Sequence, residues 1–352
     1  MIAINNHSGF PVELLSIPDP DGQEIPLLVS SQTWLYSDGS AWEPAPEPPP
    51  ICFADEYFGK PSVYSSVSNE AQTATNKQAI DVVVNGSAYA PRGVPTRTVT
   101  VELHIGTISK QVRVVGDRFK TFSGPSAPAE FVLMPLIYER AYGGFDTRRQ
   151  MFWEQNPAGI GFHGARSQRK DVLTEYPNLE PVQGSLEAQP AGYGIISRGW
   201  SPRIGYAGTY DAEWLNHQWP LLPRDFDFRH YQAAPIDQQV ASLGTGDRVR
   251  MVNFTSDGVW EFAMPSTTLN CWVISDCGKR QTAPCMDTVL IEPDQRRMTM
   301  VFRINLAGES SHGRIREVIV GSVSPGYLRA RERRKPYFDF RNTHPSDAAV
   351  VE

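Results

Sequence analysis

The chain of 352 residues has few cysteines and no long apolar run. Its four cysteines, Cys52, Cys271, Cys277 and Cys285, are too few for a disulfide framework in a chain of this length. No stretch approaches the roughly 18 consecutive apolar residues that a membrane-spanning helix needs. Residues 1–7 carry neither a basic start nor a sustained apolar core, so they do not resemble a secretory signal. We therefore expect a cytoplasmic protein with reduced thiols and no membrane contact.

The sequence also lacks the common catalytic motifs. It contains no Gly-x-Ser-x-Gly elbow, no His-Glu-x-x-His pair and no Walker loop. Cys271, Cys277 and Cys285 are too widely spaced for a zinc knuckle. Residues 159–164 (GIGFHG) match the dinucleotide fingerprint, but no strand pattern precedes them and no apolar helical face follows in residues 165–170. We predict no catalytic residue, no metal site and no cofactor.

Charge is distributed unevenly along a chain whose net charge is −6. Residues 1–60 contain nine acidic residues and one basic residue, whereas residues 312–341 contain eight basic and three acidic residues. Such polarity either steers a partner or lets the two ends of the chain attract each other. Glycine and proline number 28 and 29, which favours many turns and few long helices.

Alternating apolar residues predict antiparallel strands. Residues 98–105 and 108–115 alternate with period two around Gly106-Thr107, as in a hairpin with a type II′ turn. Residues 80–84 form another strand, and the pattern returns in residues 251–254, 259–264, 269–275, 289–291, 298–304 and 316–320. We predict a mainly-β fold of antiparallel sheets, sandwich-like or barrel-like, with few short helices.

We divide the chain into four regions. Residues 1–135 form an N-terminal β-rich region, and residues 136–245 form an irregular segment rich in Gly, Pro and aromatics that packs on the sheets. Residues 246–325 form a C-terminal antiparallel β region, and residues 326–352 form a basic and then polar tail. Within the irregular segment only residues 210–219 look helical, with Thr209 as N-cap and Pro220 as the stop.

Three further segments can each be interpreted in two ways. Residues 42–50 (WEPAPEPPP) predict polyproline II, as a stiff connector or a docking ligand. On a strand, Asp225, Asp227 and Arg229 would share one face, either as an acid–base pair of carboxylates or as a structural ion pair. The basic run 329–335 indicates a solvated or partner-binding tail in preference to nucleic-acid binding, because the protein as a whole is acidic.

The central segments resemble a known family. They comprise residues 131–144 (FVLMPLIYERAYGG), 156–162 (NPAGIGF), 177–180 (PNLE), 192–196 (GYGII), 208–211 (GTYD) and 222–227 (LPRDFD). In their order and in their amino-acid sequence they are similar to the bacterial "domain of unknown function twenty-one sixty-nine" family, and the similarity covers about residues 1–300. The resemblance implies a non-enzymatic adaptor or chaperone of type VI secretion. Its partners would be an effector with a PAAR-like region and the VgrG spike.

Tyr, Trp and Arg concentrate at interface hot spots, so they are the candidate partner-binding residues. In this chain the candidates are Arg140, Tyr142, Trp200, Tyr210, Trp214, Arg229, Arg331 and Arg333. Two alternatives stay open. One is a β-rich hydrolase or carbohydrate-active enzyme that uses Asp225 and Asp227, and the other is a lectin-like module that stacks sugars on Trp200, Trp214 or Trp219.

Overall fold

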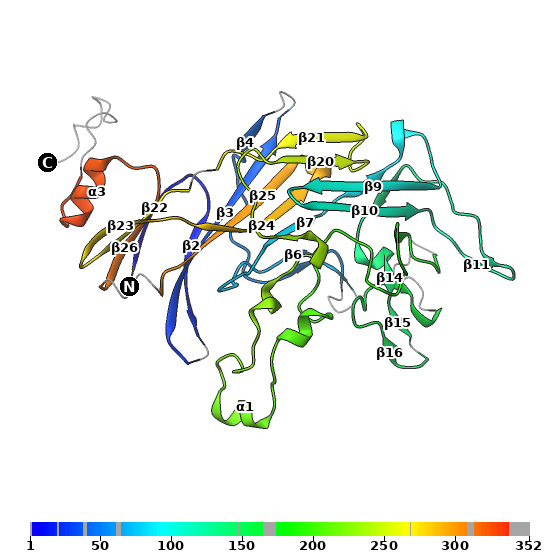
Figure 1. Cartoon of the computed structure of the whole chain (residues 1–352), viewed down its shortest axis with the longest axis horizontal. Coiled ribbons are helices and arrows are strands. Elements are labelled where there is room, and N and C mark those ends of the chain that lie inside the picture. Colours follow the sequence, from blue (N-terminus) through cyan, green and yellow to red (C-terminus); the bar gives the residue numbers. More distant parts are fainter. Residues whose placement is uncertain are drawn as a thin grey trace. The chain divides into compact units, whose positions relative to one another are not determined.

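A computed structural model describes most of the chain, and contacts divide it into two compact units. Unit 1 comprises residues 1–9, 268–284 and 306–352, and unit 2 comprises residues 10–267 and 285–305. Figure 1 shows the course of the chain through both units. The described residues are 2–19, 21–37, 41–60, 65–146, 148–164, 174–267, 269–307 and 313–337. The end of the predicted tail, residues 338–352, therefore lies outside them.

The largest sheet of unit 2 has seven strands, in the order β19–β7–β24–β25–β3–β2 with β4 beside β3. β7 and β24 run parallel, and the other neighbours are antiparallel. The predicted burial of Met298, Met300, Phe302 and Ile304 is confirmed, but Val301 and Arg303 between them are buried as well, so both faces of β25 are covered there. The strands are β2 (Val12–Pro18), β3 (Glu24–Tyr36), β4 (Trp42–Pro44), β7 (Ile80–Val84), β19 (Gln239–Val240), β24 (Cys285–Glu292) and β25 (Arg297–Asn305).

A second sheet of unit 2 has five strands, in the order β18–β10–β9–β20–β21. The predicted hairpin at its centre is confirmed, and Gly106 takes the positive φ of 55° that its turn requires. Val101 and Leu103 are buried, as the alternation indicated. The strands are β9 (Thr98–Ile105), β10 (Ile108–Val115), β18 (Leu179–Pro181), β20 (Arg248–Val252) and β21 (Val259–Ala263).

Short strands and 3-10 turns form the rest of unit 2. Tyr193 anchors the irregular central segment to the second sheet, because its buried hydroxyl donates to the carbonyls of Val101 (2.9 Å) and Lys110 (3.2 Å). The short strands are β5 (Glu56–Tyr57), β6 (Val67–Asn69), β8 (Ser87–Tyr89), β11 (Lys120–Thr121), β12 (Gly124–Pro125), β13 (Leu133–Pro135), β14 (Tyr142–Gly143), β15 (Phe145–Asp146), β16 (Met151–Phe152) and β17 (Ile160–Gly161). The helical elements are η2 (Pro91–Gly93), η3 (Tyr138–Arg140), η4 (Phe162–Gly164), η5 (Arg203–Tyr206), α1 (Ala212–His217), η6 (Phe228–Tyr231), η7 (Ile236–Gln238) and η8 (Pro293–Gln295).

The described residues of unit 1 form a four-stranded sheet and the helix α3. Its strand order is β1–β26–β22–β23, in which β1 and β26 are parallel. Leu328 of the helix packs on Ile274 and Ile319 of the sheet. The elements are β1 (Ala3–His7), β22 (Cys271–Ser275), β23 (Gly278–Thr282), β26 (Ile315–Gly321) and α3 (Pro325–Glu332).

The mainly-β prediction is confirmed, and the sheets stay open: among the described residues none closes into a barrel. The predicted helix at residues 210–219 is shorter than expected, because Asp211 and not Thr209 caps α1 at its N-terminus. We placed the helices near residues 209–219, but the basic run begins inside a second helix, α3. No described helix has the length and apolar character to cross a membrane.

Candidate functional site

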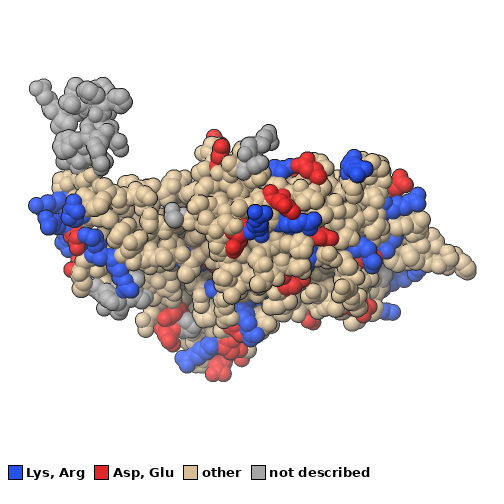
Figure 2. Space-filling view, turned by 45° about the horizontal axis from the view of Figure 1, so that its top comes forward, with Lys and Arg blue, Asp and Glu red and all other residues tan. Residues whose placement is uncertain are grey.

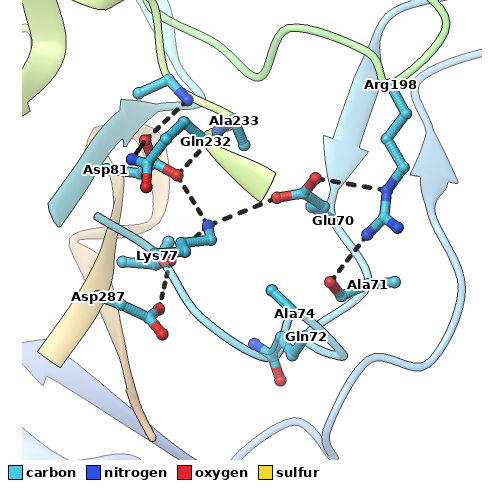
Figure 3. Close-up of polar contacts among 12 residues, drawn as sticks. Glu70, Ala71, Gln72, Ala74, Lys77, Asp81, Arg198, Gln232, Ala233 and Asp287 are labelled. Carbon is cyan, nitrogen blue, oxygen red and sulfur yellow. Dashed lines mark hydrogen bonds and ion pairs between the residues drawn. The ribbon is translucent and has the colours of Figure 1, made fainter. Parts of the chain in front are cut away.

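The candidate site rests on a group of buried charges in unit 2, centred on Lys77 and Asp81 (Figure 3). Lys77 Nζ lies 2.7 Å from Asp81 Oδ2, 3.0 Å from Thr288 Oγ1 and 3.6 Å from Glu70 Oε2. The Lys77 and Asp81 side chains are only 2% and 0% exposed. Charges buried this deeply are tolerated when they are paired and hydrogen-bonded. Lys77 therefore depends on both carboxylates around it.

Asp81 also holds a distant part of the chain against β7. Its Oδ1 accepts hydrogen bonds from Gln232 Nε2 (3.0 Å) and the Ala234 amide (3.1 Å), and its Oδ2 accepts one from the Ala233 amide (2.8 Å). Together with Lys77, four donors converge on this one carboxylate. The segment that follows η6 is thus fixed to β7, the second strand in the order of the large sheet.

Glu70 fixes a second segment in the same way. Arg203 Nη2 lies 2.5 Å from Glu70 Oε1, and Arg198 Nε lies 3.5 Å from the same oxygen. Burial by itself would raise the pKa of Glu70, but the charges of Arg203, Lys77 and Arg198 outweigh it and leave that pKa below its ordinary value. The carboxyl is therefore ionised at neutral pH and ties η5 to the buried charges.

These two anchored segments lie side by side and form what we call the neck, residues 203–208 and 226–232. Arg203 Nε donates to the His230 carbonyl (2.9 Å), and His230 Nδ1 donates to the Arg203 carbonyl (2.8 Å). The Asp227 amide donates to the Tyr206 carbonyl (3.0 Å), and the Arg229 guanidinium lies 4.3 Å from the centre of the Tyr206 ring. Burial lowers the pKa of His230, and the charges of Arg203 and Arg198 lower it further.

Beyond the neck the chain makes an excursion, residues 209–225, which we call the α1 lobe. Figure 1 shows it as a loop that projects away from the sheets of unit 2. Asp225 closes its base, because Oδ1 accepts from the Thr209 amide (3.0 Å) and Oδ2 from the Thr209 hydroxyl (2.8 Å). Gly208 has a φ of +81°, and a Cβ there would lie 2.9 Å from both Asp225 Oδ1 and Pro223 Cβ. The closed base therefore requires glycine at this position.

The α1 lobe is packed by its own side chains. Asp211 caps α1 through the Trp214 amide (2.9 Å), and Trp214 Nε1 donates to the Leu221 carbonyl (2.9 Å). The rings of Tyr210 and Trp214 meet edge to face with centroids 4.7 Å apart. The α1 lobe is therefore an ordered excursion whose ends are joined and whose interior is filled, and surface loops held on a rigid scaffold frequently carry function.

Apolar side chains nevertheless point outward from the α1 lobe. Tyr210, Leu215 and Trp219 are 52%, 60% and 64% exposed. A groove of about 290 Å³ adjoins the neck, and its lining includes Pro202, Tyr206, Arg229, Pro235 and Ile236. Exposed apolar groups beside an apolar groove are typical of a protein-binding surface.

Asp225 and Asp227 do not form the carboxylate pair of the hydrolase alternative. The predicted strand is wrong here: Asp227 caps the 3-10 turn η6 through the Arg229 amide (2.9 Å), so the two carboxyls have separate partners. Hydrogen bonds from the Thr209 amide and hydroxyl lower the pKa of Asp225, and hydrogen bonds from Arg229 lower that of Asp227. A general acid needs the opposite shift. The predicted pairing of Arg229 with a neighbouring carboxylate is confirmed for Asp227, at 2.6 Å.

The structure brings together only some of the candidate partner-binding residues. Tyr210 and Trp214 lie in the α1 lobe and Arg229 at its neck, whereas Trp200 is buried against Tyr138. Elsewhere in unit 2, Arg140 Nη1 donates to Asn178 Oδ1 (2.9 Å), and the hydroxyl of the half-buried Tyr142 donates to Glu187 Oε1 (3.3 Å). In unit 1, Arg331 pairs with Glu317 (2.9 Å), and the exposed Arg333 caps the end of α3.

Sequence reasoning missed the buried charges and the outward-facing Leu215 and Ile236. One signal was available, since Asp81 interrupts the apolar run Ile80–Val84 and a carboxylate in a buried strand needs partners. Residues 159–164 form part of β17 and η4, while the segment after them, 165–173, lies outside the described residues. In the described part of the chain no three Cys, His, Asp or Glu side chains lie close enough to hold a metal ion.

Comparison with known proteins agrees with the resemblance over the central segments. The family model described as "Uncharacterized protein conserved in bacteria (DUF2169)" matches residues 21–303. The chain belongs to this family. The matched region includes the buried charges, the neck and the α1 lobe, but it ends before β26 and α3. No curated protein and no solved structure matches the chain.

Proposed function

We propose that this member of the DUF2169 family is a non-enzymatic, cytoplasmic adaptor that binds a type VI secretion effector with a PAAR-like region. In this proposal it keeps the effector soluble and assists its loading onto the VgrG spike. Family membership supports the proposal through the resemblance described above. The α1 lobe supplies the surface with which such an adaptor would hold its partner.

The observation that carries the proposal is the combination of exposed apolar groups with a rigid base. Tyr210, Leu215 and Trp219 face outward, yet the lobe is closed by Asp225 and its neck is tied to Asp81 and Glu70. A surface that is ordered before binding loses less conformational entropy when the partner arrives. Aromatic residues held in this way make interface hot spots.

The chaperone role follows from the same surface. An effector that must later mount on a spike exposes apolar surface beforehand, and large exposed apolar patches invite aggregation. A partner that covers such a patch stabilises the effector by mass action, by about 2.7 kcal/mol at a hundredfold excess over Kd. The exposed Leu215 and Trp219 are the side chains best placed to cover it.

The test co-expresses the protein with a type VI secretion effector from the same bacterium that carries a PAAR-like region. We expect the double variant Leu215→Ser/Trp219→Ser to lower the soluble effector and its secretion at least about tenfold, the loss that one or two hot-spot side chains cause. Phe122→Ser is the matched control, because Phe122 is fully exposed in unit 2 but outside the α1 lobe. If deletion of the whole protein leaves effector solubility and secretion unchanged, the adaptor proposal fails.

A further inference from the structure

Unit 1 carries a charge opposite to that of the rest of the chain. Its described residues contain nine Lys and Arg against three acids, Asp276, Glu317 and Glu332. Over all its residues, unit 1 has ten basic and seven acidic residues, a net charge of +3. Because the whole chain has a net charge of −6, unit 2 has a net charge of −9. Figure 2 shows blue side chains gathered at the left of the view, where Figure 1 draws α3.

The three described acids of unit 1 are already engaged. Glu317 pairs with Arg331 (2.9 Å), and Glu332 pairs with Lys279 (2.9 Å). Asp276 lies 3.3 Å from both Arg316 and Arg334. These pairs leave the exposed Arg314, Arg329 and Lys335 of unit 1 without a carboxylate partner among the described residues, whereas the exposed Arg333 interacts electrostatically with Glu332.

Two of these cations flank a free sheet edge. Within the described residues β23 has a strand neighbour on one side only, β22. Glu332 of α3 reaches Lys279 of β23, so this flank of α3 faces the edge. Arg329 lies three residues before Glu332 on the same flank of the helix, and Arg333, the C-cap residue, follows Glu332 directly. β23, Arg329 and Arg333 together are called the basic edge.

The backbone of β23 is suited to accept another strand. β22 and β23 are joined by a two-residue turn, and Ser275 pairs with Gly278 across it. In such a hairpin the two residues that flank the turn form both N–H···O=C bonds with each other. Every second residue pair along the two strands then does the same, and the pairs between them form none across the ladder. The backbone groups of Lys279 and Gln281 therefore point away from β22. The N–H and C=O groups of these two residues could form hydrogen bonds with the backbone of an extended polypeptide, but not with another kind of polymer.

We propose that the basic edge is a docking site for an acidic, extended polypeptide segment of the protein's partner, which adds to the sheet beside β23. Main-chain hydrogen bonds would give such a strand its affinity, and Arg329 and Arg333 would select its carboxylates. β23 lies within the family match whereas Arg329 and Arg333 lie beyond it, so the charges of this site would let one member of the family select its own partner. The inference rests on the proposed function only in naming the effector as the owner of the segment.

Geometry favours a polypeptide over a nucleic acid. A strand edge offers alternating donors and acceptors at the spacing of a backbone, which phosphates do not match. The cations of the basic edge would attract carboxylates and phosphates alike, so the spacing of the backbone groups decides between the two polymers.

The experiment measures fluorescence anisotropy with the full-length protein and a labelled peptide of about twelve residues that alternates Glu with Thr. The comparison probes are the same peptide with Gln in place of Glu and a single-stranded oligothymidine of similar length. We expect binding of the acidic peptide alone, weakened between about 50 and 300 mM NaCl because exposed charges are screened. Arg329→Glu/Arg333→Glu should raise Kd at least about tenfold, while Lys120→Glu/Arg248→Glu, with the same charge change on exposed residues of unit 2, should leave it within about twofold.

A second variant separates strand addition from simple charge attraction. Gln281→Pro removes an outward-facing N–H without changing any charge, so it should weaken the acidic peptide at least about threefold. Equal binding of oligothymidine and peptide, or no effect of both variants, would overturn the proposal. The Leu215→Ser/Trp219→Ser variant should bind the peptide normally. Loss of effector stabilisation with peptide binding intact would therefore count against the adaptor function and not against the basic edge.

Discussion

Removal of the Asp81 charge is expected to destabilise unit 2 strongly, because this carboxylate accepts from four donors in the buried strand β7. Asparagine has one acceptor oxygen, so in Asp81→Asn its amide group must face two donors in either orientation. Breaking a buried ion pair costs about 3–5 kcal/mol. The Glu70 carboxylate, 3.6 Å from Lys77 Nζ, offsets part of the loss. We therefore expect Asp81→Asn to cost about 3–4 kcal/mol.

The pair can be tested by a double-mutant cycle. Lys77→Met leaves Asp81 with three of its donors and should cost about 3 kcal/mol. The double variant should be less destabilised than the sum of the single variants by about 1–3 kcal/mol, because the second change removes a charge that the first left unpaired. Glu130→Gln, which breaks the exposed Arg97–Glu130 pair, is the control and should cost under about 1 kcal/mol.

The assay is guanidinium unfolding of the full-length variants, followed by tryptophan fluorescence, with hydrogen exchange across the neck and the α1 lobe. Exchange should rise in residues 203–208 and 226–232 of Asp81→Asn, since Gln232 and its neighbours lose their anchor. The reasoning that Asp81 and Lys77 hold the neck as a charged pair would be refuted by either of two results. One is a loss of unfolding free energy below about 1 kcal/mol in Asp81→Asn, and the other is a double variant whose loss equals the sum of the single losses within about 0.5 kcal/mol.

Three further predictions concern the neck and the lobe. Since burial lowers the pKa of His230 below 6.5, folding favours its neutral form. The stability this gives is present above pH 6.5 and declines as pH falls below it, so His230→Asn should flatten the stability–pH curve below pH 6.5. Gly208→Ala should cost at least about 2 kcal/mol and open the lobe in hydrogen exchange, whereas Gly184→Ala, with a φ of +90° and nothing within 4 Å, should cost about 1 kcal/mol. Leu215→Ser/Trp219→Ser should change the unfolding free energy by less than about 1 kcal/mol, because both side chains are exposed; a larger loss would make the lobe structural.

Part of the candidate site could be predicted from the sequence and part could not. The sequence indicated a short helix near residues 210–219 and an ion pair at Arg229, and both exist. It misplaced the N-cap and predicted a strand at residues 225–229, because local bonds from Asp211 and Asp227 to nearby amides compete with regular structure. Whether a side chain caps a turn or the backbone joins a strand depends on where the rest of the chain runs, which the local sequence does not show.

The strands are the part that the sequence by itself determined. Apolar alternation specifies which face of β9, β10, β20 or β25 is buried, and a turn glycine such as Gly106 specifies where the chain reverses. Only the tertiary structure decided that β7 runs parallel to β24, more than 200 residues later in the chain, and that Lys77 and Asp81 meet Glu70 and Gln232. The alternation of apolar residues in a sequence shows which side chains are buried, but it does not show which strand lies beside them. A buried charge gains its partner only when distant segments fold together, which is why the support of the α1 lobe was not visible in the sequence.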